Sequence, residues 1–136
     1  MKANCFSGDT EVLTSFGLKR IDSIKEGDKI VTRQGYKKAT RCILAGDRKV
    51  KRWTIIYEDK VTASITCTEM HKMFTDLGWI PIKCVTEGMY MCRKDCDDLV
   101  KVSFIGSDDM GYDFCYDLEV ADEHEYYANG LLVRSI

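Results

Sequence analysis

Cys5 is the residue whose type and position most directly suggest chemistry, because it follows Asn4 and can act on the bond between them. Its sulfur can reach the Asn4 carbonyl carbon through a five-membered ring, and attack there would convert the amide into a thioester. An amide resists this change, so the step needs a proton donor at the Cys5 nitrogen and a strained, buried peptide bond. A cysteine near a terminus usually has no catalytic role. Whether Cys5 is a nucleophile therefore has to be judged from the residues around it.

The chain has two histidines and one well-placed carboxylate that could serve such a reaction. An imidazole titrates near neutral pH, so His71 could carry a proton to the leaving nitrogen; the alternative is a buried or surface histidine without a chemical role. Asp117 and Cys115 share one face of an alternating segment, where a carboxylate and a thiol would titrate together; alternatively, Asp117 is a surface carboxylate. His124 lies among acidic residues, which also fits an exposed turn.

The hydrophobic pattern that must position these residues is that of strands. Residues 61–68 alternate strictly between apolar and hydroxyl side chains, and residues 115–120 alternate again. Residues 53–57, 101–105 and 130–133 are rich in β-branched and aromatic residues, and turn signals such as Asn129-Gly130 separate the segments. Only residues 18–26 could form a short helix. The pattern predicts an all-β sandwich or barrel-like fold.

Composition limits the classes of function. The chain has 136 residues, which fits one domain, and its net charge of −2 offers no basic face for nucleic acid. No apolar run approaches the roughly 20 residues of a membrane span, and the first residues lack the apolar core of a signal peptide. We therefore expect a cytoplasmic monomer with no membrane and no nucleic-acid partner. The seven cysteines are then predicted to be reduced thiols, and no metal and no cofactor is expected.

Four segments resemble, in order, the splicing blocks of inteins. Residues 5–14, CFSGDTEVLT, are similar to the N-terminal block, and residues 68–71 form the T-x-x-H of the second block. Residues 115–120 with His124, and then residues 128–133, resemble the last two blocks. The resemblance covers nearly the whole chain, and it identifies the sequence as similar to a mini-intein without an endonuclease domain, or to a close relative in the Hedgehog–intein (Hint) superfamily.

This resemblance implies a fold, boundaries and roles. The fold would be a Hint horseshoe of many short antiparallel strands that brings both ends of the chain together. Residues 1–4 would be an upstream flank, residues 5–135 a single splicing domain, and Ile136 the first downstream residue. Thr68 would hydrogen-bond the scissile peptide or orient His71, Asp117 would assist the steps after the thioester, and His124 would assist C-terminal cleavage. The partners would be the flanking host segments in cis, in an autocatalytic, single-turnover reaction rather than enzymatic turnover.

The sequence departs from the intein pattern at its end. Inteins usually finish with histidine and asparagine, followed by a nucleophile, and these positions fall on Arg134, Ser135 and Ile136. Serine cannot close the succinimide that releases the downstream segment, and isoleucine cannot accept a thioester. We therefore expect splicing to stop before completion. The ending fits a trapped or altered mini-intein, a truncated chain, or an intein-like or Hedgehog-type domain that performs only N-terminal cleavage.

Two other classes of function also fit the sequence. The chain could be a non-catalytic β-barrel binding module, or a metal-binding or redox domain that uses Cys84, Cys92 and Cys96. A disulfide to Cys5 would silence the acyl shift, so redox control is a hypothesis. Residues 48–52 are basic but lack aromatic stacking partners, and a solvated hairpin end is expected there. Residues 93–98 are expected to form an exposed loop that joins the two halves.

Overall fold

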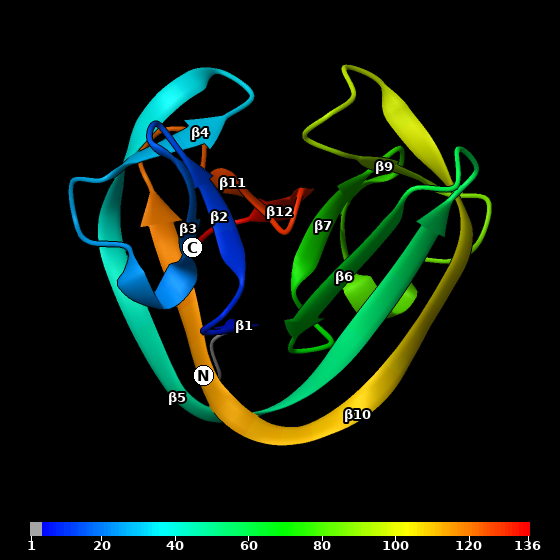
Figure 1. Cartoon of the computed structure of the whole chain (residues 1–136), viewed down its shortest axis with the longest axis horizontal. Coiled ribbons are helices and arrows are strands. Elements are labelled where there is room, and N and C mark those ends of the chain that lie inside the picture. Colours follow the sequence, from blue (N-terminus) through cyan, green and yellow to red (C-terminus); the bar gives the residue numbers. More distant parts are fainter. Residues whose placement is uncertain (1–3) are drawn as a thin grey trace.

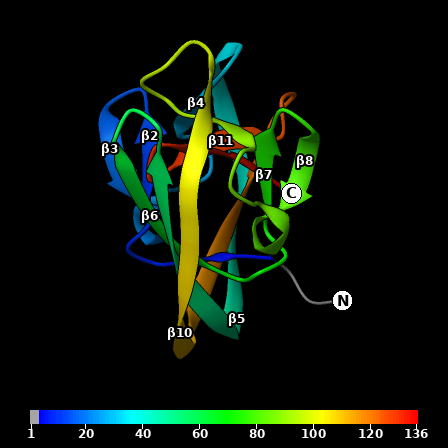
Figure 2. The same cartoon turned by 90° about the vertical axis from the view of Figure 1, so that its right-hand side faces the viewer.

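Two long strands give the molecule its outline. The computed structural model describes residues 4–136, and in it β5 (Gly35–Tyr57) and β10 (Leu99–Val120) pair as antiparallel neighbours along most of their length. The pair bends into a U whose arms carry the shorter strands, and in side view β10 extends over most of the height of the molecule (Figures 1 and 2). The predicted all-β, horseshoe-like fold is confirmed.

The shorter elements are distributed over both arms of the U. The strands are β1 (Phe6–Ser7), β2 (Glu11–Thr14), β3 (Gly17–Arg20), β4 (Lys29–Thr32), β6 (Thr62–Cys67), β7 (Lys72–Thr75), β8 (Gly78–Pro81), β9 (Tyr90–Cys92), β11 (Glu125–Ala128) and β12 (Leu131–Arg134). The order across the sheet is β11-β12-β7-β9-β10-β1-β6-β5-β4-β2-β3, with β8 on β7. Within residues 4–136 no helix is long and apolar enough to cross a membrane.

The described part of the chain has two helices, both single 3-10 turns, η1 (Ile21–Ser23) and η2 (Ile82–Cys84). The short helix predicted over residues 18–26 is thus reduced to η1. Leu18 belongs to β3 and is exposed, so the apparent spacing of Leu18, Ile21 and Ile24 is not a helix face. Only the two isoleucines are buried, and they pack into the core from η1 and the residue after it.

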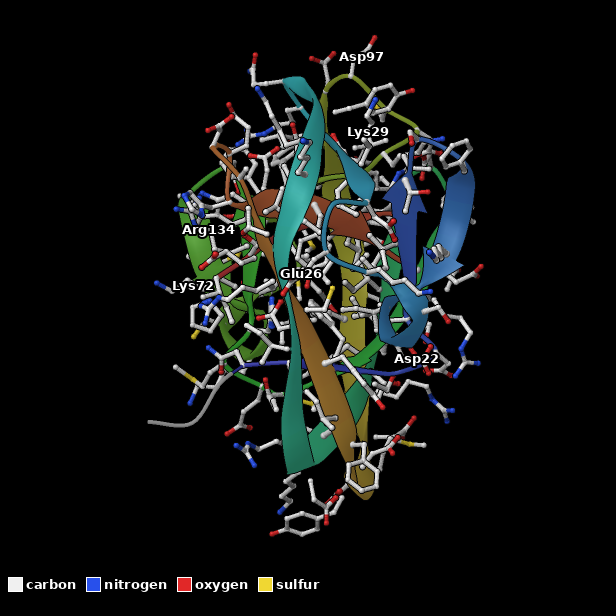
Figure 3. All side chains as sticks on the ribbon, turned by 90° about the vertical axis from the view of Figure 1, so that its left-hand side faces the viewer. Asp22, Glu26, Lys29, Lys72, Asp97 and Arg134 are labelled. Carbon is white, nitrogen blue, oxygen red and sulfur yellow. A yellow bond between two sulfur atoms is a disulfide. The ribbon has the colours of Figure 1, made fainter. Side chains whose placement is uncertain are left out.

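The core lies between the arms and follows the predicted alternation. In β6, Ile65 and Cys67 are buried while Thr62 and Ser64 are exposed, which confirms the half-buried strand predicted for residues 61–68. Burial of large side chains such as Tyr57 and Tyr126 supplies most of the folding free energy of a domain like this. Charged side chains, including Asp22, Glu26 and Lys29, lie on the outside (Figure 3).

A tight hairpin returns the last strand to the centre of the molecule. Asn129 and Gly130 have positive φ angles of 47° and 81°, as a type I′ turn between β11 and β12 requires. The Asn129 side chain also accepts a hydrogen bond from the Glu11 backbone N–H at 2.7 Å and donates one to the Ser64 carbonyl at 2.8 Å. The predicted turn is confirmed, and it places β12 between β11 and β7.

The expectation of an exposed loop at residues 93–98 is wrong for Arg93. This side chain is only 6% exposed, and its guanidinium donates to Asp59 at 2.8 and 2.9 Å and to Asp95 at 2.9 Å. It also lies over the Tyr57 ring, with 4.7 Å between the guanidinium carbon and the ring centroid. A buried guanidinium is tolerated here because two carboxylates neutralise it.

Candidate functional site

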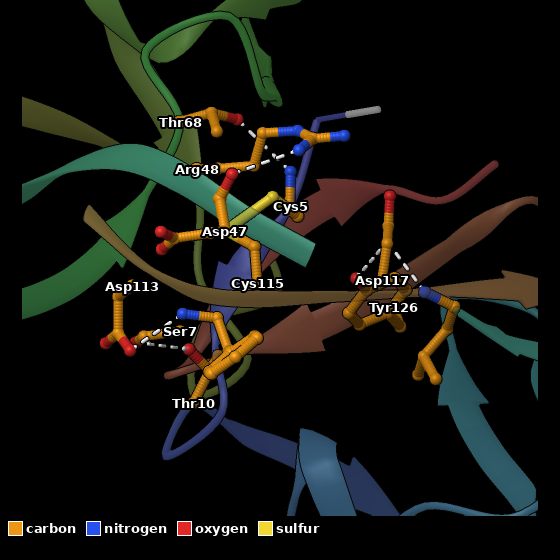
Figure 4. The surroundings of a disulfide bond; sticks show 12 residues. Cys5, Ser7, Thr10, Asp47, Arg48, Thr68, Asp113, Cys115, Asp117 and Tyr126 are labelled. Atoms are coloured by element: carbon orange, nitrogen blue, oxygen red, sulfur yellow. Dashed lines mark hydrogen bonds between the residues drawn. A yellow bond between two sulfur atoms is a disulfide. The ribbon is translucent and has the colours of Figure 1, made fainter. Parts of the chain in front are cut away.

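Thr68 forms hydrogen bonds with both the backbone N–H and the backbone carbonyl of Cys5. The Cys5 amide N–H donates a hydrogen bond to Thr68 Oγ1 at 3.1 Å, and the Cys5 carbonyl accepts one from the Thr68 N–H at 3.1 Å (Figure 4). Cys5 is fully buried and directly precedes β1, which lies between β10 and β6. The nitrogen that would be the leaving group of an acyl shift therefore has a hydroxyl next to it.

Cys5 forms a disulfide with Cys115, and the two Cα atoms are 5.2 Å apart (Figure 4). The expectation that every cysteine is a reduced thiol is wrong for this pair. Antiparallel pairing of β1 with β10 sets Ser7 opposite Cys115 and so brings the two sulfur atoms together. A sulfur in a disulfide is not a nucleophile, so the structure represents the oxidised form of the site.

His71 connects the beginning of the chain with its end. Its ring packs on Phe6 with 4.0 Å between ring centroids, and its Nε2 lies 2.9 Å from the Arg134 carbonyl oxygen. Because a carbonyl oxygen only accepts, Nε2 carries the hydrogen. Burial lowers the pKa of His71 to about 4, although the bond to Arg134 opposes this shift, and the ring is therefore neutral near pH 7. Nδ1 is buried without a hydrogen-bond partner among residues 4–136.

Asp117 is held by Tyr126, a residue that the sequence analysis missed. The Tyr126 hydroxyl donates to Asp117 Oδ1 at 2.6 Å, and the Leu118 N–H donates to the same oxygen at 2.7 Å. Burial raises the pKa of Asp117 to about 7, and both hydrogen bonds oppose this rise. In Figure 4 this pair lies to one side of the Cys5–Cys115 disulfide. Tyr126 lies in β11, two residues after His124. The only sequence signal for it is its place in a short strand, and that pattern does not indicate contact with Asp117.

The C-terminal residues are fixed by backbone contacts. The Ser135 N–H donates to the His124 carbonyl at 2.9 Å, and the Ile136 N–H donates to the Leu118 carbonyl at 3.1 Å. His124 Nδ1 lies 3.1 Å from the Ile136 carbonyl oxygen. The guanidinium of Arg134 points away, over the Trp79 ring at 5.2 Å. His124, Ser135 and Ile136 therefore meet at the predicted C-terminal junction.

Direct contacts thus unite Cys5, Thr68, Phe6 and His71 with the Arg134 carbonyl. Asp117 joins this set through Tyr126, whose ring meets Phe6 edge-on with 6.0 Å between centroids. His71 therefore contacts both Phe6, which follows Cys5, and the carbonyl of Arg134, which precedes the predicted C-terminal junction.

Comparisons with known proteins agree with this geometry. No protein-family model and no curated protein matches the chain. Among solved structures, the crystal structure of gp41-1 intein matches with a TM-score of 0.80 and 29% identity, over 98% of this chain and 99% of that one. The DnaX mini intein from Spirulina platensis matches with a TM-score of 0.75 and 27% identity, over 98% and 100% of the two chains.

A bacterial intein-like domain from Clostridium thermocellum also matches, with a TM-score of 0.76 and 21% identity over 99% of each chain, which is a likeness of fold. The class of this protein is therefore the Hint fold, the architecture shared by its structural neighbours. Within that class the chain is similar to the mini-inteins, the protein-splicing domains, and the resemblance read from its four sequence blocks is confirmed.

Proposed function

We propose that this domain activates its own Asn4–Cys5 bond by an N-to-S acyl shift when the Cys5–Cys115 disulfide is reduced. The Cys5 sulfur attacks the Asn4 carbonyl carbon, a C–S bond replaces the C–N bond, and the thiol proton ends on the freed Cys5 amine. The product is an isomer of the starting chain, so no cofactor is consumed.

The observation that carries this proposal is the hydrogen bond from the Cys5 N–H to Thr68 Oγ1 at 3.1 Å. As the amide nitrogen becomes an amine it gains a lone pair, and the Thr68 hydroxyl is positioned to donate to it. Cys5 is fully buried. Asn4 lies at the edge of an open pocket of about 650 Å³ that Thr68 also lines, which leaves room for an upstream segment and for a small thiol.

The proposed partners are host segments in cis, before Cys5 and after Ser135, around a monomeric domain of residues 5–135. Asn4 is the one residue of the upstream flank that the structure describes. His124 serves the C-terminal junction, and Asp117 serves the steps that follow the thioester. Ser135 stands where an asparagine would close a succinimide, and Ile136 offers no nucleophile, so we propose that complete splicing does not occur. The absence of membrane and nucleic-acid partners and the cytoplasmic location remain predictions.

Intact-mass measurement of a fusion with a soluble tag ahead of Met1 tests the proposal. A phosphine reductant opens the disulfide without attacking a thioester, and a small thiol is added second. We expect the thiol to release the tag and residues 1–4 as a thioester, since thiol exchange captures the activated carbonyl. Cys5→Ala provides the control, which should release nothing. A fully reduced, folded protein that keeps its mass would contradict the proposal and would favour a Hint fold retained for binding.

A second candidate is an intein-like domain that performs N-terminal cleavage only. The observation that favours it is the ending, because neither Ser135 nor Ile136 can support the usual succinimide or acyl transfer. The two candidates differ in whether release of the upstream segment requires an added nucleophile. A domain specialised for cleavage hydrolyses its thioester in water at a rate comparable with its formation, whereas a trapped splicing precursor accumulates the thioester until a thiol is supplied.

A further inference from the structure

The Arg134–Ser135 bond repeats the local chemistry of the Asn4–Cys5 bond. In each case a side-chain nucleophile follows a carbonyl and can close a five-membered ring on it. Ser135 is 7% exposed, so its hydroxyl is largely shielded from water. A second bond in this chain therefore has a built-in nucleophile, at the junction where the sequence lacks asparagine.

The carbonyl oxygen of this bond already has a hydrogen-bond donor. His71 Nε2 lies 2.9 Å from the Arg134 oxygen, within the range found for groups that stabilise an oxyanion. His71 is 2% exposed, and its ring is held by packing on Phe6. A fixed N–H in a water-poor setting favours negative charge on that oxygen, which is the charge that forms when the carbonyl is attacked.

The Ser135 hydroxyl is held in place by its own contacts. Its Oγ accepts a hydrogen bond from the Val120 N–H at 3.3 Å and donates one to the Ile136 carbonyl at 3.1 Å. His124 Nδ1 lies 3.1 Å from that same Ile136 oxygen, so the carbonyl that accepts the hydrogen bond of the hydroxyl has a second contact. The Ser135 N–H donates a hydrogen bond to the His124 carbonyl at 2.9 Å. The hydroxyl and the backbone nitrogen of Ser135 are thus both held by hydrogen bonds.

We propose that Ser135 is a second backbone nucleophile, which converts the Arg134–Ser135 amide into an ester by an N-to-O acyl shift. Oγ bonds to the Arg134 carbonyl carbon, the bond from that carbon to the Ser135 nitrogen breaks, and the hydroxyl proton ends on the freed amine. His71 is the catalytic residue that donates to the carbonyl oxygen. Water, or an added nucleophile, then cleaves the ester and leaves one product ending at Arg134 and another beginning at Ser135.

This activity goes beyond the proposed N-terminal reaction, because it uses another nucleophile at another junction. It also differs from intein C-terminal cleavage. That reaction breaks the bond after a terminal asparagine, which here would be the bond between residues 135 and 136. The bond broken here lies one residue upstream, and the mass of the product separates the two routes. The C-terminal side of the domain can then react although it lacks the asparagine.

Intact-mass spectrometry of the full chain with hydroxylamine at neutral pH tests the inference. The Cys5→Ala variant is used as the parent, since it cannot form the N-terminal thioester. We expect residues 135–136 to be lost and Arg134 to gain a hydroxamate. Ser135→Ala should abolish this product, and Ser103→Ala, which removes an exposed serine that bonds the Ile56 carbonyl, should leave its rate unchanged. His71→Gln should slow the reaction by roughly 10²-fold, as the loss of one oxyanion donor does.

A Ser135→Cys variant keeps the inference falsifiable if the ester forms slowly. It should become cleavable after Arg134 by a small thiol, because the shift then gives a thioester. Circular dichroism establishes that each variant is folded. The inference is overturned if the parent and Ser135→Cys both stay intact while folded, if Ser135→Ala still cleaves, or if the cut falls after Ser135. A protein with Cys5 restored reports the N-terminal reaction separately, through a product that lacks residues 1–4.

Discussion

At the scale of single residues, the site is defined by which atoms touch the two scissile peptides. Thr68 contacts the nitrogen of Cys5, whereas His71 contacts the carbonyl of Arg134. The sequence predicts His71 as the proton carrier for Cys5, yet in the oxidised structure its Nε2 lies at the other junction, against the Arg134 carbonyl oxygen. The group nearest to the leaving nitrogen is a hydroxyl, and the first reaction should therefore depend strongly on Thr68.

Substitution of Thr68 tests this dependence. Thr68→Val keeps the branched shape and removes the oxygen that accepts from the Cys5 N–H, so we expect thiol-induced release of the upstream segment to slow about tenfold, the effect of one hydrogen bond worth about 1.4 kcal/mol. Thr68→Ser restores the hydroxyl and should recover most of the rate. The release rate of the reduced fusion is the measurement. An unchanged rate in Thr68→Val would remove Thr68 from the mechanism.

At the scale of elements, the pairing of β1 with β10 places the two sulfur atoms together. Cys5 precedes β1, and Cys115 lies within β10 opposite Ser7. The pairing of β1 with β6 presents Cys5 to Thr68, and the pairing of β1 with β10 presents it to Cys115. The reaction and the disulfide compete for one sulfur, so opening the disulfide is a precondition of the acyl shift.

Removal of Cys115 should uncouple the reaction from the redox state. With hydroxylamine in place of the thiol, which would itself open the disulfide, we expect the parent to release its upstream segment at least tenfold faster after reduction by a phosphine, because only the thiolate attacks a carbonyl. Cys115→Ser should react equally well with and without the reductant. Cys42→Ser is the matched control, since Cys42 is an exposed free thiol, and it should keep the parent's dependence. A continuing need for reductant in Cys115→Ser would mean that another thiol controls the site.

The elements also show what the sequence could and could not predict. The alternation of residues 61–68 and the Asn129-Gly130 turn identified β6 and the β11–β12 hairpin, because both patterns are local. The full lengths of β5 and β10 were not predictable, since their middle parts pair mainly with each other and are largely exposed, so no buried face marks them. Cys5 and Cys115 are 110 positions apart, and Asp59 and Arg93 are 34 positions apart. The local sequence around each residue does not indicate which distant residue it contacts.

At the scale of the whole molecule, two buried ionisable groups make opposite contributions to the dependence of stability on pH. Asp117 has a pKa of about 7 when folded, against roughly 3.9 in an unfolded chain, so between these values only the folded chain keeps the proton. Its contribution to stability is full below pH 4 and is lost as the pH rises through 7. His71 has a pKa of about 4 when folded, against roughly 6.5 unfolded. Between these values the unfolded chain binds the proton, so the contribution of His71 grows as the pH rises.

The two opposing slopes of the unfolding free energy against pH should nearly cancel in the parent. A net slope should appear when either group is removed. Relative to the parent, Asp117→Asn should gain about 1–2 kcal/mol in the free energy of unfolding between pH 4.5 and 6.5, because the His71 contribution is left alone. His71→Gln should lose a similar amount over the same range. Urea denaturation of the three proteins at both pH values, in one redox state, gives these differences, and the exposed carboxylates shared by all three cancel. Parallel pH profiles for all three would show that neither group has the perturbed pKa.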